Sequence, residues 1–325
     1  MRLPVEDLKV GMFVKMPLSW HEHPFLKNAF LVESEREIAL IRETGLQEVE
    51  VDLTRSRLPS RTPEAAMHPP GGEGQGERGP VVPAELLATI KERGVPAEKR
   101  AVRVWENSLV MMKNLLDEPS GPRIKEAKEG IAAVINLILN DEDTTHYLIN
   151  ITEHDFNTYT HCVNVGVLGV ALAKAFFGLS SEHDLMALGV GFFLHDLGKV
   201  KVDPAIINKP SRLTEEEMRE MRRHPAHGYR ILLETRQLTE ESRLIVLQHH
   251  ERRDGTGYPR GLRGDEIHIY GRLCSLVDVY DALTADRPYK SKLDPFSALK
   301  LMREEMIGHF QRDLFERFVL MFRAP

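Results

Sequence analysis

One stretch of ten residues decides how most of this chain folds: Val190-Gly191-Phe192-Phe193-Leu194-His195-Asp196-Leu197-Gly198-Lys199. Its first half consists of apolar residues and glycine, which indicates a helix buried in a protein core. His195 and Asp196 follow directly, and imidazole nitrogen and carboxylate oxygen are both ligands of divalent metal ions. The stretch therefore predicts a core helix that ends at a buried polar pair.

More histidines and an aspartate recur on either side of this pair, each on or at the end of a segment with helical apolar spacing. They are His161, His224, His249, His250 and Asp278. Any one of these histidines alone would more often be a hydrogen-bonded core residue than a ligand. Together, five histidines and two aspartates in one helical region favour a metal site, because side chains from several packed helices converge inside a bundle.

Several further polar residues have roles that the sequence leaves open. Asp196 carries two carboxylate oxygens and is suited to bridge two cations. Lys199 follows the histidine–aspartate pair by about one helical turn, so it either lies near the metal or is an ordinary solvated charge. Asp281 either orients a ligand or caps nearby backbone, and His154 and His227 are candidates for supporting a ligand.

The composition limits the class of protein. The chain has 325 residues, 42% of them hydrophobic, which is enough for two domains with a substantial core. Its formal net charge of −6 argues against non-specific binding to DNA. No apolar run approaches the length of a membrane span, and the N-terminus lacks the apolar stretch of a signal peptide. Cys162 and Cys274 fit apolar helical patterns as small packed residues, so we expect a soluble, cytoplasmic protein.

Residues 1–55 combine strand-like and helical patterns. Gly11–Met16 is typical of a short strand after a turn, and Val49–Val51 alternates like a strand. Ser34 and Glu37 form a capping box for a helix between these strands. These patterns predict a small α+β domain.

The rest of the chain is a linker and a helical region. Residues 56–83 are rich in proline and glycine, which predicts a flexible linker. Residues 84–325 have mostly helical apolar spacing. Two of the apolar stripes are Leu109, Met112, Leu115 and Leu116, and Ile131, Val134, Ile135 and Ile138. The predicted fold is therefore mainly α, a helical bundle joined by the linker to the small N-terminal domain.

Five motifs, in this order, resemble those of the HD-GYP domain, a subgroup of the HD metal-dependent phosphohydrolases. They are Thr158-Tyr159-Thr160-His161, His195-Asp196-Leu197-Gly198-Lys199, His224-Pro225-Ala226-His227-Gly228, the stretch from His249 to Leu262, and the stretch from Asp278 to Tyr289. Residues 1–55 look like the small N-terminal domain, of unestablished function, that precedes some HD-GYP domains. That weaker resemblance rests on Gly11-Met12, on Trp20 with Pro24-Phe25, and on Val49-Glu50-Val51-Asp52.

The resemblance implies an all-helical domain with a centre of two or three metal ions. Its implied metal ligands are His161, His195, Asp196, His224, His249, His250 and Asp278. Lys199 and Arg287 would hold phosphate oxygens of the substrate, and Gly257-Tyr258-Pro259 would be the signature loop beside the site. Asn157 stands where a glutamate accompanies the three-metal version, and an amide is a poor cation ligand, so we expect two ions. The resemblance favours iron or manganese.

The function implied by the resemblance is hydrolysis of cyclic di-GMP to pGpG, and then to GMP if the second step proceeds. Two cations sharing Asp196 would lower the pKa of a bridging water from about 15.7 towards 7, which makes hydroxide available. Asp196 and Lys199 are thus the expected catalytic residues. One alternative is a cyclic dinucleotide sensor with low turnover that acts through signalling proteins. Another is an HD phosphohydrolase acting on nucleotides or single-stranded nucleic acid. The oligomeric state is left open, with a homodimer among the options.

Overall fold

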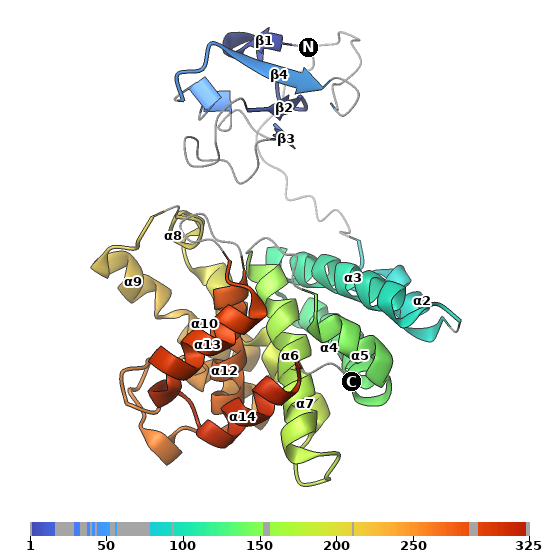
Figure 1. Cartoon of the computed structure of the whole chain (residues 1–325), viewed down its shortest axis with the longest axis vertical. Coiled ribbons are helices and arrows are strands. Elements are labelled where there is room, and N and C mark those ends of the chain that lie inside the picture. Colours follow the sequence, from blue (N-terminus) through green and yellow to red (C-terminus); the bar gives the residue numbers. More distant parts are fainter. Residues whose placement is uncertain are drawn as a thin grey trace. The chain divides into compact units, whose positions relative to one another are not determined.

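The computed structural model describes residues 2–16, 29–32, 38–39, 41–42, 44–52, 56, 79–92, 94–151, 157–209, 211–285 and 292–322. They belong to two compact units, Met1–Glu77 and Arg78–Pro325, and each is described by itself (Figure 1). The described chain is mainly helical with a small sheet in its first unit, as the sequence predicts.

The first unit contains a four-stranded antiparallel sheet. Its strands are β1 (Arg2–Pro4), β2 (Phe13–Lys15), β3 (Ala29–Leu31) and β4 (Glu48–Asp52), in the spatial order β1-β4-β2-β3. Val49 and Val51 of β4 are buried and alternate with exposed acidic residues, so one face of the sheet is covered. Val51 is paired with Val14 of β2. β2 and β4 confirm the two strands predicted from the sequence.

A short helical segment contributes to the core of the first unit. Residues 38–39 and 41–42 are helical, and Ile38 and Ile41 are fully buried together with Val14 and the β4 valines. The predicted capping residues Ser34 and Glu37 lie outside the described residues, as do Trp20, Pro24 and Phe25.

The second unit is a bundle of helices. They are α2 (Ala84–Lys91), α3 (Ala97–Asp117), α4 (Gly121–Asn140), α5 (Glu142–Ile149), α6 (Thr158–Phe177), α7 (Leu185–Leu194), α8 (Pro204–Ile207), α9 (Glu215–Met221), α10 (His224–Glu234), α11 (Glu240–Gln248), α12 (Ile269–Thr284), α13 (Pro295–Glu305) and α14 (Arg312–Leu320). Figure 1 shows α6 and α7 near the middle of this unit. The stripe Ile131, Val134, Ile135 and Ile138 is fully buried.

Residues 190–194, at the end of α7, are held by close packing of α7 against α6. Phe192 and Phe193 of α7 are fully buried. A Cβ atom on Gly166 of α6 would lie 2.4 Å from the Phe193 ring, and one on Gly169 would lie 2.7 Å from the Phe192 ring. Any larger residue at these glycines would push the helices apart. This close packing fixes the end of α7, where His195 follows.

The helix α6 corrects one expectation from the sequence. It is long and apolar enough to cross a membrane by length and composition, although we expected no such run. In the structure, however, 78% of its most apolar window is buried inside the protein. Buried polar residues, among them His161 and Asn164, also lie on this helix. Thr158–Phe177 is therefore a core helix of the bundle.

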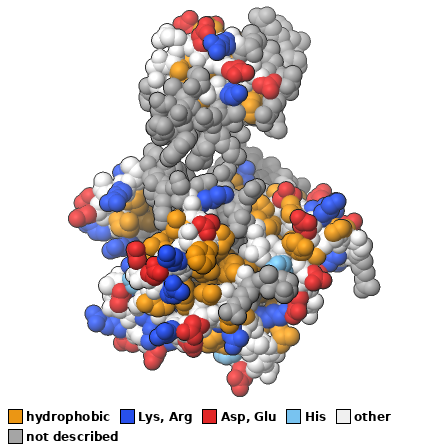
Figure 2. Space-filling model, viewed as in Figure 1, with side chains coloured by type: hydrophobic (Ala, Val, Ile, Leu, Met, Phe, Trp, Pro, Cys, Tyr) orange, Lys and Arg blue, Asp and Glu red, His pale blue; other side chains and the backbone are white. Residues whose placement is uncertain are grey.

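The second unit begins before residue 84, where we expected the linker to end. Val81 is fully buried in the helical core, and Asn114 of α3 donates a hydrogen bond to its carbonyl oxygen at 3.3 Å. Residues 57–78 of the predicted linker lie outside the described residues. On the face drawn in Figure 2, the described acidic and basic side chains are interspersed.

Candidate metal centre

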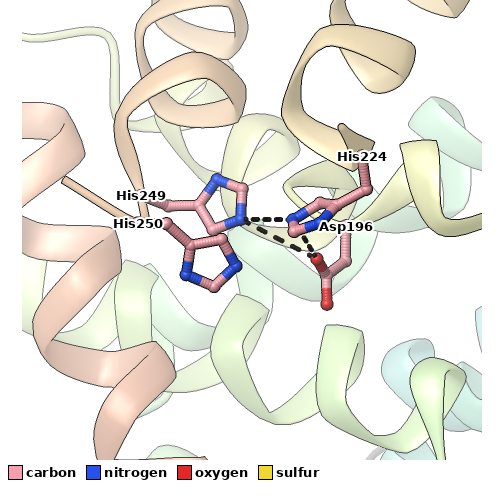
Figure 3. Close-up of side chains that lie close together, drawn as sticks. All are labelled: Asp196, His224, His249 and His250. Carbon is pink, nitrogen blue, oxygen red and sulfur yellow. Dashed lines mark hydrogen bonds and ion pairs between the residues drawn. The ribbon is translucent and has the colours of Figure 1, made fainter. Parts of the chain in front are cut away.

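Seven polar side chains of the second unit meet where several helices begin or end. They are His161 on α6, His195 and Asp196 after α7, His224 at the start of α10, His249 and His250 after α11, and Asp278 on α12. They form two groups whose possible ligand atoms lie within 4.8 Å of one another. The first donor group is His161, His195 and Asp278, and the second is Asp196, His224, His249 and His250 (Figure 3).

The first donor group is almost completely buried. The Nε2 atom of His161 lies 3.2 Å from Nε2 of His195 and 3.0 Å from Oδ1 of Asp278. These three residues are 2%, 0% and 8% exposed. The group therefore presents two imidazole nitrogens and a carboxylate oxygen to one point away from bulk water.

The second donor group is arranged in the same way. The Nε2 atom of His224 lies 3.1 Å from Nε2 of His249 and 3.2 Å from Oδ1 of Asp196. In Figure 3 these three side chains point towards one another, and His250 lies beside His249. The Nδ1 atom of His250 is 3.3 Å from Oδ2 of Asp278, so this ring also faces the first donor group.

Asp196 lies between the two donor groups. Its Oδ2 atom is 3.4 Å from Nε2 of His161 and 3.5 Å from Nε2 of His195. Its Oδ1 atom faces Nε2 of His224 and, at 3.8 Å, Nε2 of His249. One carboxylate therefore directs one oxygen at each group, which is the arrangement that a bridging ligand requires.

The hydrogen bonds of the rings fix which nitrogen atoms are free to bind a cation. Nδ1 of His195 lies 2.8 Å from the Phe192 carbonyl oxygen, and Nδ1 of His224 lies 2.8 Å from that of Met221. Nδ1 of His249 makes the same kind of bond within its own helix. A carbonyl oxygen only accepts, so Nδ1 carries the proton in each ring. The Nε2 lone pairs of the neutral rings therefore point into the centre.

These lone pairs test whether the residues fit a metal ion. Oδ1 of Asp196 is buried and has no hydrogen-bond partner among the described residues, although two Nε2 atoms face it. An anionic oxygen and unprotonated nitrogens repel one another unless a cation lies between them. Nitrogens bound at about 2.0–2.1 Å to one metal are about 2.9–3.4 Å apart. The Nε2 separations of 3.1 and 3.2 Å in the two groups match this spacing.

Burial and nearby carboxylates shift the pKa values of the rings in opposite directions. Burial lowers the pKa of His224 to about 4 and also lowers the pKa values of His195 and His250. Burial also opposes charge on His161, but hydrogen bonds to Asp278 and Asp281 raise its pKa to about 9. Three rings are thus held neutral, the form that binds metals. At His161 a proton and a metal ion compete for Nε2.

Lys199 lies beside the bridging carboxylate. It is on a 3-10 turn (Leu197–Lys201), and its Nζ atom is 2.5 Å from Oδ2 of Asp196. Burial lowers the pKa of Lys199, but the nearby carboxylates of Asp196 and Asp278 act against it and the pKa is raised overall, so the side chain stays charged. Burial raises the pKa of Asp196, whereas the positive charge of Lys199 and hydrogen bonds to the neighbouring histidines lower it. The net result is a pKa well below the usual range of an aspartate.

The loop after α11 places Tyr258 beside the second donor group. The ring centroids of Tyr258 and His250 are 4.6 Å apart. A Cβ on Gly257 would lie 2.4 Å from the backbone nitrogen of Arg252, so only glycine fits at this close approach. Glu251 is 1% exposed and accepts hydrogen bonds from the backbone N–H groups of Arg260 and Leu262, at 2.7 and 2.9 Å. This buried carboxylate fixes the loop next to the site.

Two family descriptions match the chain. Residues 179–314 match the family described as HD domain, and residues 1–129 match a domain of unknown function, DUF3391. Over 328 aligned residues the chain is 34% identical to the cyclic di-GMP phosphodiesterase PA4108 of Pseudomonas aeruginosa, covering 98% of this chain and 75% of that protein. The chain belongs to the HD-GYP family of HD-domain phosphodiesterases.

Other known proteins resemble parts of this HD-GYP chain or its fold. The 3′3′-cGAMP-specific phosphodiesterase 3 of Vibrio cholerae is 40% identical to this chain over 126 residues. The aligned part covers 39% of this chain and 27% of that protein. The structure of Bd1817, described as an HDG"Y"P protein from Bdellovibrio bacteriovorus, superimposes with a TM-score of 0.63. It is 16% identical and covers 100% of this chain and 99% of that one, which shows a shared fold.

Asn157 has a structural role in this HD-GYP chain. It is the N-cap of α6, and its side chain accepts a hydrogen bond from the backbone N–H of Thr160 at 2.8 Å. Capping stabilises a helix start by about 1 kcal/mol. The amide oxygen is thus used by the helix that presents His161, which agrees with the expectation that Asn157 is not a ligand.

The other residues singled out in the sequence either lie outside the described residues or belong to neither donor group. Arg287 and His154 are outside the described residues. His227 belongs to neither donor group. Cys162 and Cys274 are buried free thiols, as predicted, and burial raises the pKa of each well above its usual range.

Two supporting carboxylates had no assigned role at the sequence level. Asp281, whose role was left open, accepts a hydrogen bond from Nδ1 of His161 at 2.7 Å and so orients a ligand. Glu251 follows a predicted helix end, and the sequence alone assigns it no role. Its position directly after two consecutive histidines and before a glycine loop was the one available signal.

Proposed function

We propose that this chain hydrolyses cyclic di-GMP to pGpG at a centre of two divalent transition-metal ions. The observation that carries the proposal is the position of Asp196, with one oxygen facing each of two buried donor groups. All seven proposed ligands belong to these groups. The name of the relative PA4108 supports cyclic di-GMP as the substrate.

We assign one ion to each donor group, with Asp196 shared. Imidazole nitrogens together with carboxylate oxygens suit iron, manganese or zinc and disfavour magnesium and calcium, which prefer oxygen ligands. Iron or manganese is proposed on the family resemblance. Asn157 caps a helix, which supports two ions rather than three. When bound, the ions supply an activated water and offset the charge of the phosphoryl oxygens.

The protein residues around the ions prepare the phosphodiester for cleavage. Lys199 holds Asp196 in place and its charged amine donates to a non-bridging phosphoryl oxygen, which stabilises charge as it builds up. Gly257, Tyr258 and Pro259 form the wall beside His250 against which the substrate rests. Arg287 is proposed as a second phosphate contact from the resemblance alone.

Two further proposals concern residues 1–55 and the location of the protein in the cell. Residues 1–55 contain none of the proposed ligands, so we propose that they regulate or localise the second unit. A cytoplasmic location is proposed because both cysteines are free thiols. A sensor with low turnover that acts through signalling proteins is the alternative.

A second substrate is favoured by one observation. A matched relative is named a 3′3′-cGAMP-specific phosphodiesterase, and that dinucleotide differs from cyclic di-GMP in one base. The phosphodiester at the metal centre would be the same. The choice between the two substrates therefore depends on contacts to the bases, outside the two donor groups.

The test is to incubate protein loaded with iron or manganese with each dinucleotide and to separate the products. We expect pGpG from cyclic di-GMP, and no product with Asp196→Asn. Asp203→Asn is the matched control, because Asp203 is an exposed helix cap close to the same stretch. Binding of cyclic di-GMP without product would favour the sensor, and faster cleavage of 3′3′-cGAMP would favour the second substrate.

A further inference from the structure

A chain of hydrogen bonds leads from α3 to a proposed metal ligand. The indole Nε1 of Trp105 donates to Oδ1 of Asn164 at 2.9 Å. Nδ2 of Asn164 donates to Oδ1 of Asp281 at 2.8 Å. Oδ2 of Asp281 lies 2.7 Å from Nδ1 of His161, whose other nitrogen points to the first donor group. Three hydrogen bonds thus join the indole to the ligand ring.

The direction of every bond in this chain is fixed by the indole. A tryptophan N–H only donates, so the Asn164 oxygen must face Trp105 and its NH₂ must face Asp281. The Asp281 carboxylate accepts from both sides, and Nδ1 of His161 therefore carries a proton. Nε2 of His161 is then the nitrogen that faces the metal position. If the indole N–H were absent, the amide could turn and place its oxygen against the carboxylate.

These three hydrogen bonds are costly to lose because the residues that make them are buried. Asn164, Asp281 and His161 are 7%, 1% and 2% exposed, so water cannot readily replace a lost partner. Asn164 follows His161 by one turn of α6, and Asp281 follows Asp278 by one turn of α12. Both helices therefore carry a donor of the first group together with a member of the chain.

We propose that Trp105 is a positioning residue for His161, acting through Asn164 and Asp281. The proposal rests on metal binding by the first donor group, as set out for the proposed function. Trp105 lies within residues 1–129, which match a domain of unknown function, and outside the HD match. The metal centre thus includes a contribution from a segment to which the family description gives no role.

The first test compares metal affinity in three full-length proteins. Trp105→Phe keeps an aromatic ring but removes the N–H donor, and we expect zinc affinity at the first donor group to fall by about 10-fold, the lower end of the loss seen when a ligand's own hydrogen-bond partner is removed. Ser108→Ala is the matched control, because it removes a buried hydrogen bond from the same helix, between Ser108 Oγ and the Val104 carbonyl. We expect this control to bind zinc like the wild type. Equal zinc affinity of Trp105→Phe and the wild type would overturn the proposal.

The second test observes the indole directly. The chain has two tryptophans, so a nitrogen–proton NMR spectrum has two indole signals, and the one lost in Trp105→Phe belongs to Trp105. Zinc is diamagnetic, and adding it to the wild type should shift this signal. The shift should disappear in Asp281→Asn, which breaks the chain in the middle.

The outcomes separate this proposal from the proposed function. If the wild type binds zinc and the Trp105 signal stays in place, the positioning role is wrong while a metal-dependent phosphodiesterase remains. If the wild type binds no zinc, iron or manganese, the proposed function and the positioning role both fail. Loss of cyclic di-GMP hydrolysis without any change in zinc affinity of Trp105→Phe would also contradict the positioning role.

Discussion

The two donor groups lie next to each other and differ in the partner of one ring, because only His161 has a carboxylate behind it while His195, His224 and His249 have backbone carbonyls. In the first, His161 is held by the carboxylate of Asp281 and faces the carboxylate of Asp278. In the second, His224 is held by the backbone carbonyl of Met221. The pKa of His161 is raised to about 9 by its two carboxylate neighbours against burial, whereas burial lowers the pKa of His224 to about 4.

This difference shows that the partner of each ring sets its affinity for positive charge. Both partners orient the ring, but a carboxylate carries a full negative charge and makes the imidazole more basic and a stronger metal ligand than a carbonyl does. The first group therefore attracts a cation more strongly. The second group depends more on the shared Asp196 for negative charge. We expect the first group to hold its ion more tightly.

Among variants that should keep both ions, the largest expected effect comes from Lys199, which contacts the Asp196 oxygen that faces the first group. Lys199→Ala should lower kcat for cyclic di-GMP by about 100–1000-fold, the cost of removing one donor to a developing charge. Metal content should stay at two ions per chain. Lys201→Ala, an exposed lysine on the same turn, should keep full activity. Metal lost in proportion to activity would show that Lys199 supports the ions rather than the phosphate.

A smaller effect should distinguish the two donor groups when the free energy of unfolding of metal-free protein is measured against pH. The folded pKa of His224, about 4, lies below its unfolded value near 6.5, so its contribution to stability is present above pH 6.5 and lost as pH falls to 4. The folded pKa of His161, about 9, has the opposite effect, and its contribution is lost as pH rises from 6.5 to 9. Each of these two contributions to the free energy of unfolding amounts to about 3 kcal/mol.

Urea unfolding at several pH values in the presence of a chelator measures these contributions. His224→Gln should flatten the acid side of the profile, and His161→Gln should flatten the alkaline side. The same pH profile in both variants and in the wild type would mean that the two groups do not differ in the way described.

The smallest expected effect is that of removing the first unit, because neither donor group draws a ligand from it. A chain beginning at residue 79 should fold, bind two ions and hydrolyse cyclic di-GMP within about tenfold of the full-length rate. The start must precede Val81, because that side chain is fully buried in the helical core. A chain beginning at residue 84 should therefore be less stable, by about 1–3 kcal/mol for the lost valine. An insoluble or metal-free protein starting at residue 79 would show that the first unit completes the second.

The sequence predicted those features that depend on local patterns. The apolar run before His195 predicted a buried helix end, and helical spacing with polar residues at helix ends named the seven side chains that the structure brings together. The division into two groups was not predictable, because it depends on how helices distant in sequence cross. Likewise, the pairing of Asp281 with His161 spans 120 residues. The strands β1 and β3 were not predicted, because each has only three residues and no glycine turn comes directly before it, whereas Gly11 comes before β2.

The central claim is that Asp196 joins two metal-binding groups, and the metal content of purified protein tests it most directly. Elemental analysis of anaerobically purified wild type should give two transition-metal ions per chain. Asp196→Ala should lose both ions, because each group loses an oxygen ligand, while Asp203→Ala should keep two. Three ions or none in the wild type, or two ions retained in Asp196→Ala, would contradict the account.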